Sequence, residues 1–363
     1  MRVVIIGGGV PAAVHAWTAV RRGHTVTHLD DGAPIAGSGA LRAGSAAATD
    51  LGRAAHSVLL WRELGGLVPG IGFRLSGSIT VARTRAELAV AEAAAAAGDA
   101  AERELTLLEP ERVRALEPAL RGPLLAGLHC GADAVLTPHQ TVPALRAHAA
   151  GTGRFTARNC LARALVETAD GVLIRADDGS ALAADVALLC PGPGLDALAR
   201  ELTGAGQAPL VRAQRLRTGP LELRPNAVLA DGDQFRHRPG YPAEPVARLA
   251  AEQAQTAAAA EFGMHVLAVP RLDGGLTLGA TAEPEPFPAE LAEPAAEHLL
   301  TVTGELCDTE LTVHGRWAEV TTAVESGPWR APSGRILVLG SAGPDATLLA
   351  PAVAEAAADD LGL

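Results

Sequence analysis

The chain has 363 residues, of which 48% are hydrophobic and 20% are charged, and its formal net charge is −11. This length predicts about two domains. Short alanine runs supply much of the apolar fraction, and without an apolar span of ~20 residues we expect no membrane segment. The acidic balance also argues against a nucleic-acid partner, which needs a basic surface.

All 30 basic residues are arginines, so lysine Schiff-base chemistry and a P-loop lysine are excluded. The four cysteines lie far apart, and no cysteine or histidine cluster has zinc-ligand spacing. We therefore expect reduced thiols and no metal. The apolar run at the N-terminus is too short for a signal peptide, so we expect a cytoplasmic protein.

The first thirty residues predict a βαβ unit of the kind that binds dinucleotides. Arg2–Ile6 is a short apolar strand, and a glycine-rich turn and a helical pattern to about Arg22 follow it. Thr25–Leu29 is a second strand, closed by two acids. Strand, glycine turn, helix, strand and acid occur in the order that the dinucleotide fingerprint requires.

Each position of this turn has a physical reason. Gly7 permits the tight turn, Gly9 lets the backbone approach a pyrophosphate, and Ala12 lets helix and strand pack closely. The helix N-terminus offers its N–H groups to phosphates, and an acid at the strand end can accept from ribose hydroxyls, which disfavours NADP. The predicted cofactor-binding residues here are Gly7, Gly9, Val10, Pro11, Ala12, Asp30 and Asp31.

Two later blocks favour FAD over the alternative, NAD. Leu161–Val166 and Val172–Arg175 predict a meander that returns to an apolar strand at Ala184–Cys190. Arg335–Leu339 predicts a buried strand, followed by a glycine turn and a helix to about Leu361. The N-terminus of this last helix can face the electron-rich end of an isoalloxazine ring.

Three segments, Gly7–Ala12 with Asp30, Val186–Gly192 and Leu337–Thr347, resemble the D-amino acid oxidase / glycine oxidase superfamily in order and spacing. The chain looks closest to the branch associated with aminophosphonate metabolism. The resemblance implies an α/β fold: a Rossmann-like FAD-binding domain of the glutathione-reductase type, with an inserted α+β substrate domain on a mostly antiparallel sheet. We expect the FAD domain at 1–79, 135–212 and 315–363, and the substrate domain at 80–134 and 213–314.

The resemblance further implies oxidation of the C–N bond of a small amine, amino acid or aminophosphonate, with transfer of the hydride of the neighbouring C–H bond to flavin N5. We expect noncovalent FAD, because no cysteine stands in an evident flavin-linking position, and O2 or another electron acceptor. Besides the first turn, the expected cofactor-binding residues are Arg42, Cys190, Gly192, Gly340, Gly343, Ala346 and Thr347.

Four residues are the predicted catalytic candidates: Arg42, His265, Arg316 and Tyr241. Without lysine, an anionic substrate group needs arginine. Arg42 follows the ribose acid, and Arg316 matches a substrate-facing arginine of related enzymes. His265 matches a histidine of the branch motif, and Tyr241 ends an arginine- and histidine-rich segment. The alternatives are a core histidine, a surface Arg–Trp pair at Arg316 and a solvated loop at 235–241.

The sequence departs from the branch pattern in three places: Arg42–Gly44, Ala280–Ala282 and Gly343–Ala346. The first keeps the arginine of the pattern but lacks its Asn and Phe. These departures support an alternative, a degenerate FAD-binding protein of the same fold with a structural or partner role.

Overall fold

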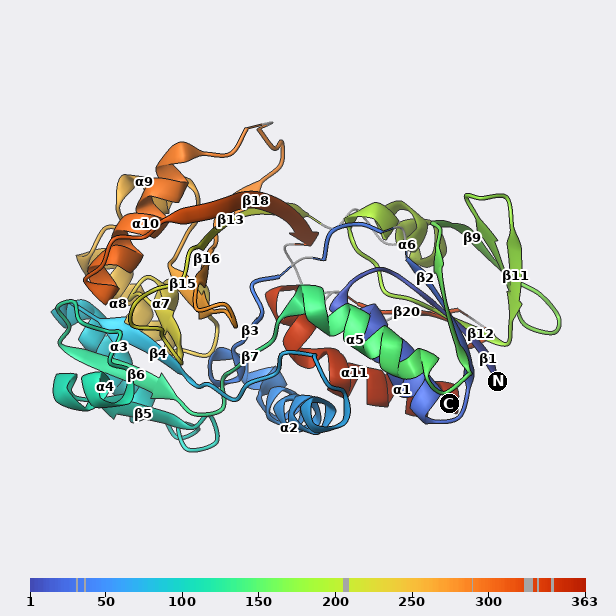
Figure 1. Ribbon diagram of the computed structural model, residues 1–363, viewed down its shortest axis with the longest axis horizontal. Helices are drawn as coiled ribbons and strands as arrows, with labels where there is room; N and C mark the ends of the chain where they lie inside the picture. The colour runs from blue at the N-terminus through green and yellow to red at the C-terminus, as the bar shows by residue number, and fades with distance from the viewer. Residues whose placement is uncertain are drawn as a thin grey trace.

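The structure is a computed structural model that describes residues 1–30, 32–35, 37–204, 209–288, 290–322, 329–331, 333–340 and 343–363. Two large sheets lie in opposite halves of the molecule, and both chain termini lie in the half that contains β1 (Figure 1). This arrangement confirms the expected α/β fold with two sheets of different kinds.

The first sheet has six described strands in the order β19-β20-β12-β1-β2-β8. Neighbouring strands are parallel, except that β19 runs antiparallel to β20. The strands are β1 (Arg2–Ile6), β2 (Thr25–Asp30), β8 (Phe155–Asn159), β12 (Val186–Leu189), β19 (Trp329–Arg330) and β20 (Ile336–Val338).

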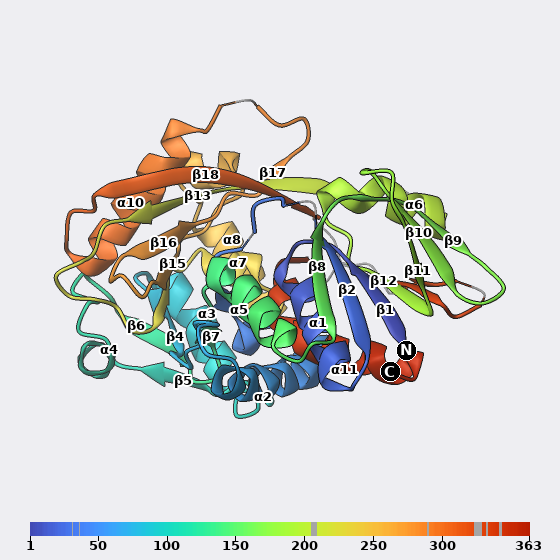
Figure 2. The same ribbon diagram turned by 45° about the vertical axis from the view of Figure 1, so that its right-hand side comes forward.

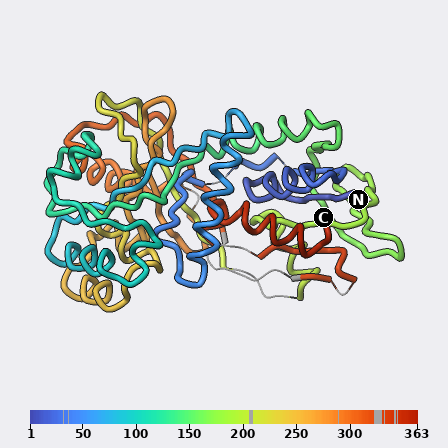
Figure 3. Tube along the Cα trace, turned by 90° about the horizontal axis from the view of Figure 1, so that it is seen from below, coloured from blue at the N-terminus to red at the C-terminus, as the bar shows by residue number. Residues whose placement is uncertain are grey.

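Strand β1 is apolar without alternation because both of its faces are buried. Val3 and Ile5 pack in a core with helices of one layer, whereas Val4 and Ile6 pack in a core on the other face. Helices α1 and α11 lie side by side in the first layer (Figure 3). The helices that contribute to this layer are α1 (Val10–Arg21), α2 (Leu51–Leu67), α5 (Pro138–Ala150) and α11 (Ala346–Leu361).

The opposite face is covered by the predicted meander, which the structure confirms as a three-stranded antiparallel sheet. Its strands are β9 (Ala162–Glu167), β10 (Val172–Ala176) and β11 (Ala181–Ala184), and helix α6 (Asp196–Thr203) packs in the same core. The predicted strand Ala184–Cys190 is too long, because Ala184 pairs with Val172 in the meander and only Val186–Leu189 pairs with β1.

The second large sheet has nine described strands and is antiparallel apart from the pair β4–β14. Its path is β17-β13-β16-β15-β14-β4-β6-β5, and β18 pairs with β13. The strands are β4 (Ser78–Ala82), β5 (Leu105–Leu108), β6 (Ala126–Cys130), β13 (Leu210–Thr218), β14 (Val228–Ala230), β15 (Leu267–Pro270), β16 (Leu276–Gly279), β17 (Glu283–Pro284) and β18 (Val313–Thr322).

Helix α10 (Glu293–Cys307) covers one face of this sheet through Leu299 and Leu306. Helix α3 (Arg85–Ala95) begins with a capping box at Thr84, and turns that include Gly98 follow it. The remaining helices of this half are α4 (Pro110–Leu116), α7 (Gln234–His237), α8 (Ala243–Glu252) and α9 (Ala257–Glu261).

Several segments connect the two halves. The short strands β3 (Ala40–Leu41) and β7 (Ala134–Val135) pair between them, and the long strands β13 and β18 extend toward the first sheet (Figures 1 and 2). The expected domain limits at 79, 212 and 314 fall inside β4, β13 and β18 and stay a prediction.

Among the described helices, none combines the length and apolarity needed to cross a membrane.

Candidate functional site

The glycine turn after β1 contains one glycine that the fold requires and one with open space beside it. Gly7 has a φ of +133°, and a Cβ there would lie 2.5 Å from the carbonyl oxygen of Cys190. Gly9 has ordinary backbone angles, and the nearest heavy atom to a Cβ there would be the Pro11 ring carbon, 3.5 Å away. The backbone of Gly9 is therefore open to a ligand.

Helix α1 starts at this open glycine without a side-chain cap. The first turn of a helix leaves its N–H groups without intrahelical acceptors, and here those of Val10 and Ala12 flank Pro11, which has none. Such a helix end attracts negative charge. The residues present thus fit the diphosphate of a dinucleotide.

Asp30 ends β2 beside the glycine turn, and a Cβ at Gly8 would touch its carboxylate. The carboxylate accepts from the Gly32 amide at 2.9 Å and from Arg146 Nη2 at 2.5 Å. Burial alone would raise the pKa of Asp30, but these donors outweigh it and hold the pKa below its ordinary value. Asp30 is therefore an ionised acceptor at the position expected for a ribose; Asp31 lies outside the described residues.

The turn after β12 lies against the glycine turn. The Cys190 amide donates to Ile6 at 2.8 Å, and burial raises the pKa of its thiol to about 12, so the thiol is protonated and unreactive at neutral pH. A Cβ at Gly192 would meet no protein atom within 4 Å. Gly192, like Gly9, has open space beside it.

The C-terminal turn connects β20 to α11. Gly340 follows the strand, residues 341 and 342 lie outside the described part of the chain, and Gly343 has a φ of +52° in a 3-10 turn that ends at Asp345. Ala346 is the first residue of α11, and the carbonyl of Thr347 accepts from the Trp61 indole at 3.1 Å. The predicted strand, turn and helix are confirmed here.

Arg42 follows β3 and is held by a buried carboxylate. Its Nε donates to Asp133 Oδ2 at 2.8 Å, and the two side chains are 6% and 1% exposed. Asp133 also accepts from the Gly44 amide at 2.9 Å and from the Ser78 hydroxyl at 2.7 Å. Burial opposes the charge of Arg42, but Asp133 and its other neighbours raise its pKa. The Nη1 atom of Arg42 is buried and has no partner among the described residues.

Tyr241 lies in the same cluster. Its ring packs edge-on against Phe235 with centroids 4.9 Å apart. The hydroxyl of Thr80, which also acts on Tyr241, accepts from Arg42 Nη2 at 3.5 Å. Burial raises the pKa of Tyr241, although Arg42 and Thr80 act in the opposite direction. The phenol is therefore neutral at pH 7.

His265 lies between α9 and β15, stacked on His237 with ring centroids 4.8 Å apart. Burial, His237 and the charges of Arg42, Arg238 and Arg215 all lower the pKa of His265 well below its ordinary value. Its Nδ1 and the Nε2 of His237 are buried without a hydrogen-bond partner in the described structure. Both rings are neutral at pH 7.

Arg238 connects this cluster to the C-terminal turn. Its Nη2 donates to both carboxylate oxygens of Asp345, at 2.8 and 2.9 Å, and its Nε donates to the Ser45 hydroxyl at 3.0 Å. The backbone carbonyl of Arg42 accepts from the same Nη2 at 3.4 Å. One guanidinium thus joins the segment after β3 to the start of α11.

The structure brings three of the four predicted catalytic residues, Arg42, Tyr241 and His265, into one cluster. His237 and Arg238 belong to the arginine- and histidine-rich segment that the sequence marked, but their own roles were not predicted. Asp133 was missed entirely, because a single aspartate before a two-residue strand carries no pattern.

The expectation that Arg316 faces the substrate is corrected by its place on β18. Arg316 pairs in register with Leu216, which is buried in the core under α10, and its guanidinium forms an ion pair with Glu293 of that helix. The preceding residue of β13, Arg215, instead forms an ion pair with Glu319 at 2.6 Å. Alternate residues of a strand face opposite sides, so Arg316 lies on the face away from His265.

Arg316→Ala should therefore leave turnover intact. We expect kcat and KM to stay within about twofold, because an exposed ion pair contributes little and the side chain is remote from the cluster. Steady-state kinetics with an acidic substrate checks this, and a large rise in KM would show that Arg316 does contribute to substrate binding.

Asp231 provides a pH-dependent test of the core beside the cluster. It directly follows β14 and accepts from the Val266 amide at 3.2 Å, and burial together with Asp233 raises its pKa to about 7. An acid whose folded pKa exceeds its unfolded value loses stability as the pH rises between the two, here from about 4 to 7. Asp231→Asn should unfold like the wild type near pH 4 but be more stable, by a few kcal/mol, above pH 7. Thermal unfolding across this range checks the sign; a constant difference would contradict the assignment.

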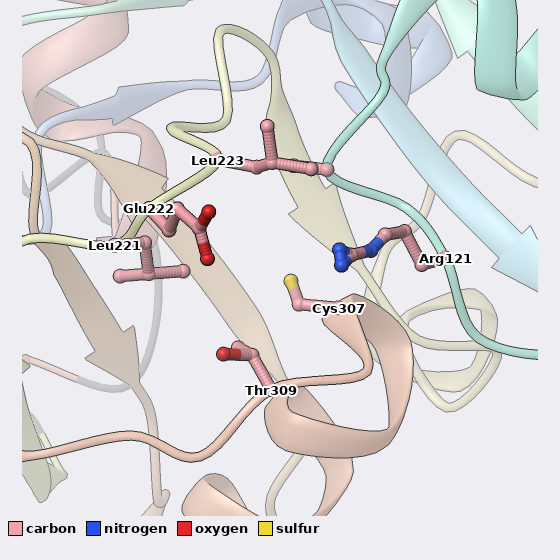
Figure 4. Close-up of a pocket in the computed structure, with 7 residues that line it drawn as sticks. Arg121, Leu221, Glu222, Leu223, Cys307 and Thr309 are labelled. Carbon is pink, nitrogen blue, oxygen red and sulfur yellow. The ribbon is translucent and has the colours of Figure 1, made fainter.

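Two hollows in the surface lie elsewhere. One, of about 30 Å³, has the Cys307 thiol near Arg121 and Glu222 (Figure 4). Burial and Glu117 raise the pKa of Cys307 to about 11, so this thiol is not a nucleophile at neutral pH. The other, of about 370 Å³, is lined by residues of α4, β5 and β6, among them His129. Neither contains a predicted site residue, and the described residues hold no metal-binding cluster.

A family model described as DAO, FAD dependent oxidoreductase, matches residues 2–360. No curated protein matches the chain in sequence. Glycine oxidase from Geobacillus kaustophilus superposes with a TM-score of 0.77 at 18% identity, covering 99% of this chain and 95% of its own.

Two further solved structures are similar. Iminodiacetate oxidase from Chelativorans sp. BNC1 has a TM-score of 0.75 at 18% identity, over 98% of this chain and 94% of its own. L-proline dehydrogenase from P. horikoshii has a TM-score of 0.76 at 16% identity, over 99% and 92%. At these identities the likeness establishes the shared fold.

Proposed function

The chain belongs to the DAO family of FAD-dependent oxidoreductases, and from this premise we propose that it oxidises the C–N bond of a small amine that carries an anionic group. An amino acid and an aminophosphonate are the two substrate classes in view. The fold shared with glycine oxidase and iminodiacetate oxidase supports an amine substrate.

The proposal assigns the cofactor contacts to three turns. The open backbone at Gly9 and the start of α1 would hold the diphosphate, and Asp30 would accept from the ribose. The C-terminal turn with Gly340, Gly343, Ala346 and Thr347 would face the ring, close to Cys190 and Gly192 in the neighbouring turn. When bound, FAD supplies the acceptor for a hydride.

One observation carries the substrate assignment. Arg42, His237 and His265 each have a buried nitrogen without a partner among the described residues, and both Arg42 and His237 act electrostatically on His265. Buried polar groups are nearly always paired, so such a group needs an explanation. A ligand with an anionic group and an N–H would satisfy the guanidinium and the imidazoles together.

The chain's own residues then have distinct tasks. Arg42, fixed by Asp133, would bind the anionic group and orient the substrate, as a guanidinium suits carboxylate or phosphonate oxygens. His265 would accept from the amine. Holding the C–H bond in one orientation is the main contribution that hydride transfer requires from the protein.

The proposal is tested with the purified flavoprotein under anaerobic conditions. Bleaching of the flavin absorbance by an amino acid or aminophosphonate supports it, and reoxidation by O2 or by an artificial acceptor then separates an oxidase from a dehydrogenase.

A second candidate is a degenerate flavoprotein with a structural or partner role. The observation in its favour is Asp345, a carboxylate paired with Arg238 where the resemblance expects a glycine-rich turn. A flavin spectrum that no anionic amine bleaches would favour this candidate.

A further inference from the structure

His237 and His265 form a pair in which each ring offers an unused nitrogen. The rings stack with centroids 4.8 Å apart and an interplanar angle of 29°. The Nε2 of His237 is buried and unpaired among the described residues, and in one of the two neutral tautomers it is a lone-pair acceptor. The Nδ1 of His265 is likewise unpaired among the described residues.

Burial and the charged groups around the pair keep both rings neutral. Arg42, Arg215 and Arg238 act on His265. Burial and Arg236 lower the pKa of His237. Asp233 and the Met264 backbone raise it by less, so the pKa stays below its ordinary value. Two adjacent imidazoles also cannot both carry a charge at low cost. Both rings of the histidine pair are therefore neutral at pH 7, and each then has one nitrogen with a free lone pair.

The same surroundings act on a substrate nitrogen. A neutral imidazole cannot neutralise an ammonium group, whereas it can accept from a neutral amine, which retains both an N–H and a lone pair. The neutral form is the one whose lone pair can form the C=N bond as the C–H bond loses its electron pair with the hydride.

We propose that His237 and His265 together accept the N–H hydrogen bond of a neutral substrate amine, while Arg42 binds the anionic group. This inference rests on the proposed function and adds His237 to the site. It makes the protein selective for ligands that combine a carboxylate with an N–H donor at short distance.

Two isosteric carboxylates test the inference without turnover. Pyrrole-2-carboxylate carries a ring N–H, and furan-2-carboxylate has an oxygen in its place. Each is titrated into the flavin-bound protein, and the change in flavin absorbance gives Kd. We expect the wild type to bind the pyrrole about tenfold more tightly, because the furan leaves the buried acceptors unpaired.

The variants locate the effect. His265→Phe and His237→Phe should remove or strongly reduce the preference, whereas His265→Gln, which keeps an acceptor, should retain part of it. His298→Gln is the matched control, since His298 on α10 also has a buried, unpartnered Nε2 but lies outside the cluster.

The outcomes separate the two proposals. Equal affinity of the two probes for the wild type, or an unchanged preference in both Phe variants, contradicts the histidine pair alone. Protein without flavin, or flavoprotein that binds neither carboxylate, contradicts the proposed function and the pair with it. If a Phe variant does not fold, the wild-type comparison and His265→Gln still decide.

Discussion

Gly9→Val should give a folded protein that retains no flavin. The Gly9 backbone is extended, and a Cβ there meets only the Pro11 ring at 3.5 Å, so the side chain fits the protein itself. The branched carbons would fill the space that a diphosphate needs at the start of α1. We expect FAD affinity to fall at least about a hundredfold, equivalent to about 2.7 kcal/mol. The ratio of flavin to protein absorbance after purification measures this loss.

Gly7→Ala is the matched control, because a substitution at this position of the same turn should affect stability rather than only flavin binding. At a φ of +133°, with the Cys190 carbonyl oxygen 2.5 Å from the new Cβ, the substitution strains the fold itself. Thermal unfolding of the two apoproteins should therefore differ: Gly7→Ala melts well below the wild type, and Gly9→Val stays close to it. Full flavin occupancy in Gly9→Val would contradict the assignment of the diphosphate site to this turn.

Much of the first sheet could be predicted from the sequence because its signals are local. The apolar run Arg2–Ile6, the glycine turn and the helix after it follow each other within thirty residues, and each restricts the next. The meander and the C-terminal strand, turn and helix are equally local. The ends of elements were less predictable: α3 stops at Ala95 although alanine continues, since helix length depends on packing as well as propensity.

The site was only partly predictable because its contacts are remote in sequence. Asp133 is 91 residues from Arg42, and Asp345 is 107 residues from Arg238. The prediction that Arg316 faces the substrate was wrong for another reason. One step along a strand reverses the face, and a family position does not reveal on which side of the sheet an arginine points. Arg215, which faces the cluster from the neighbouring strand, was not predicted as a site residue.

Asp133→Ala should be strongly destabilising, because Asp133 is fully buried and serves as an acceptor for its neighbours. It would leave the Arg42 guanidinium buried without its carboxylate and the Gly44 amide without its acceptor. Removing one member of a buried ion pair costs about 3–5 kcal/mol. Glu63→Ala is the control, because it breaks an exposed pair with Arg21 and should cost no more than about 1 kcal/mol. Urea unfolding of each purified variant gives both values.

The double variant Asp133→Ala/Arg42→Met distinguishes a charge effect from a packing effect. With both charges removed, neither is left unpaired, so the double variant should lose much less stability than the sum of the two single variants. The double variant should also bind furan-2-carboxylate much more weakly than the wild type. This ligand has no N–H for the histidine pair, so its affinity depends on Arg42, which would bind the carboxylate. Additive losses of stability would show that Asp133 serves the fold independently of Arg42, and retained carboxylate binding would place the anion site elsewhere.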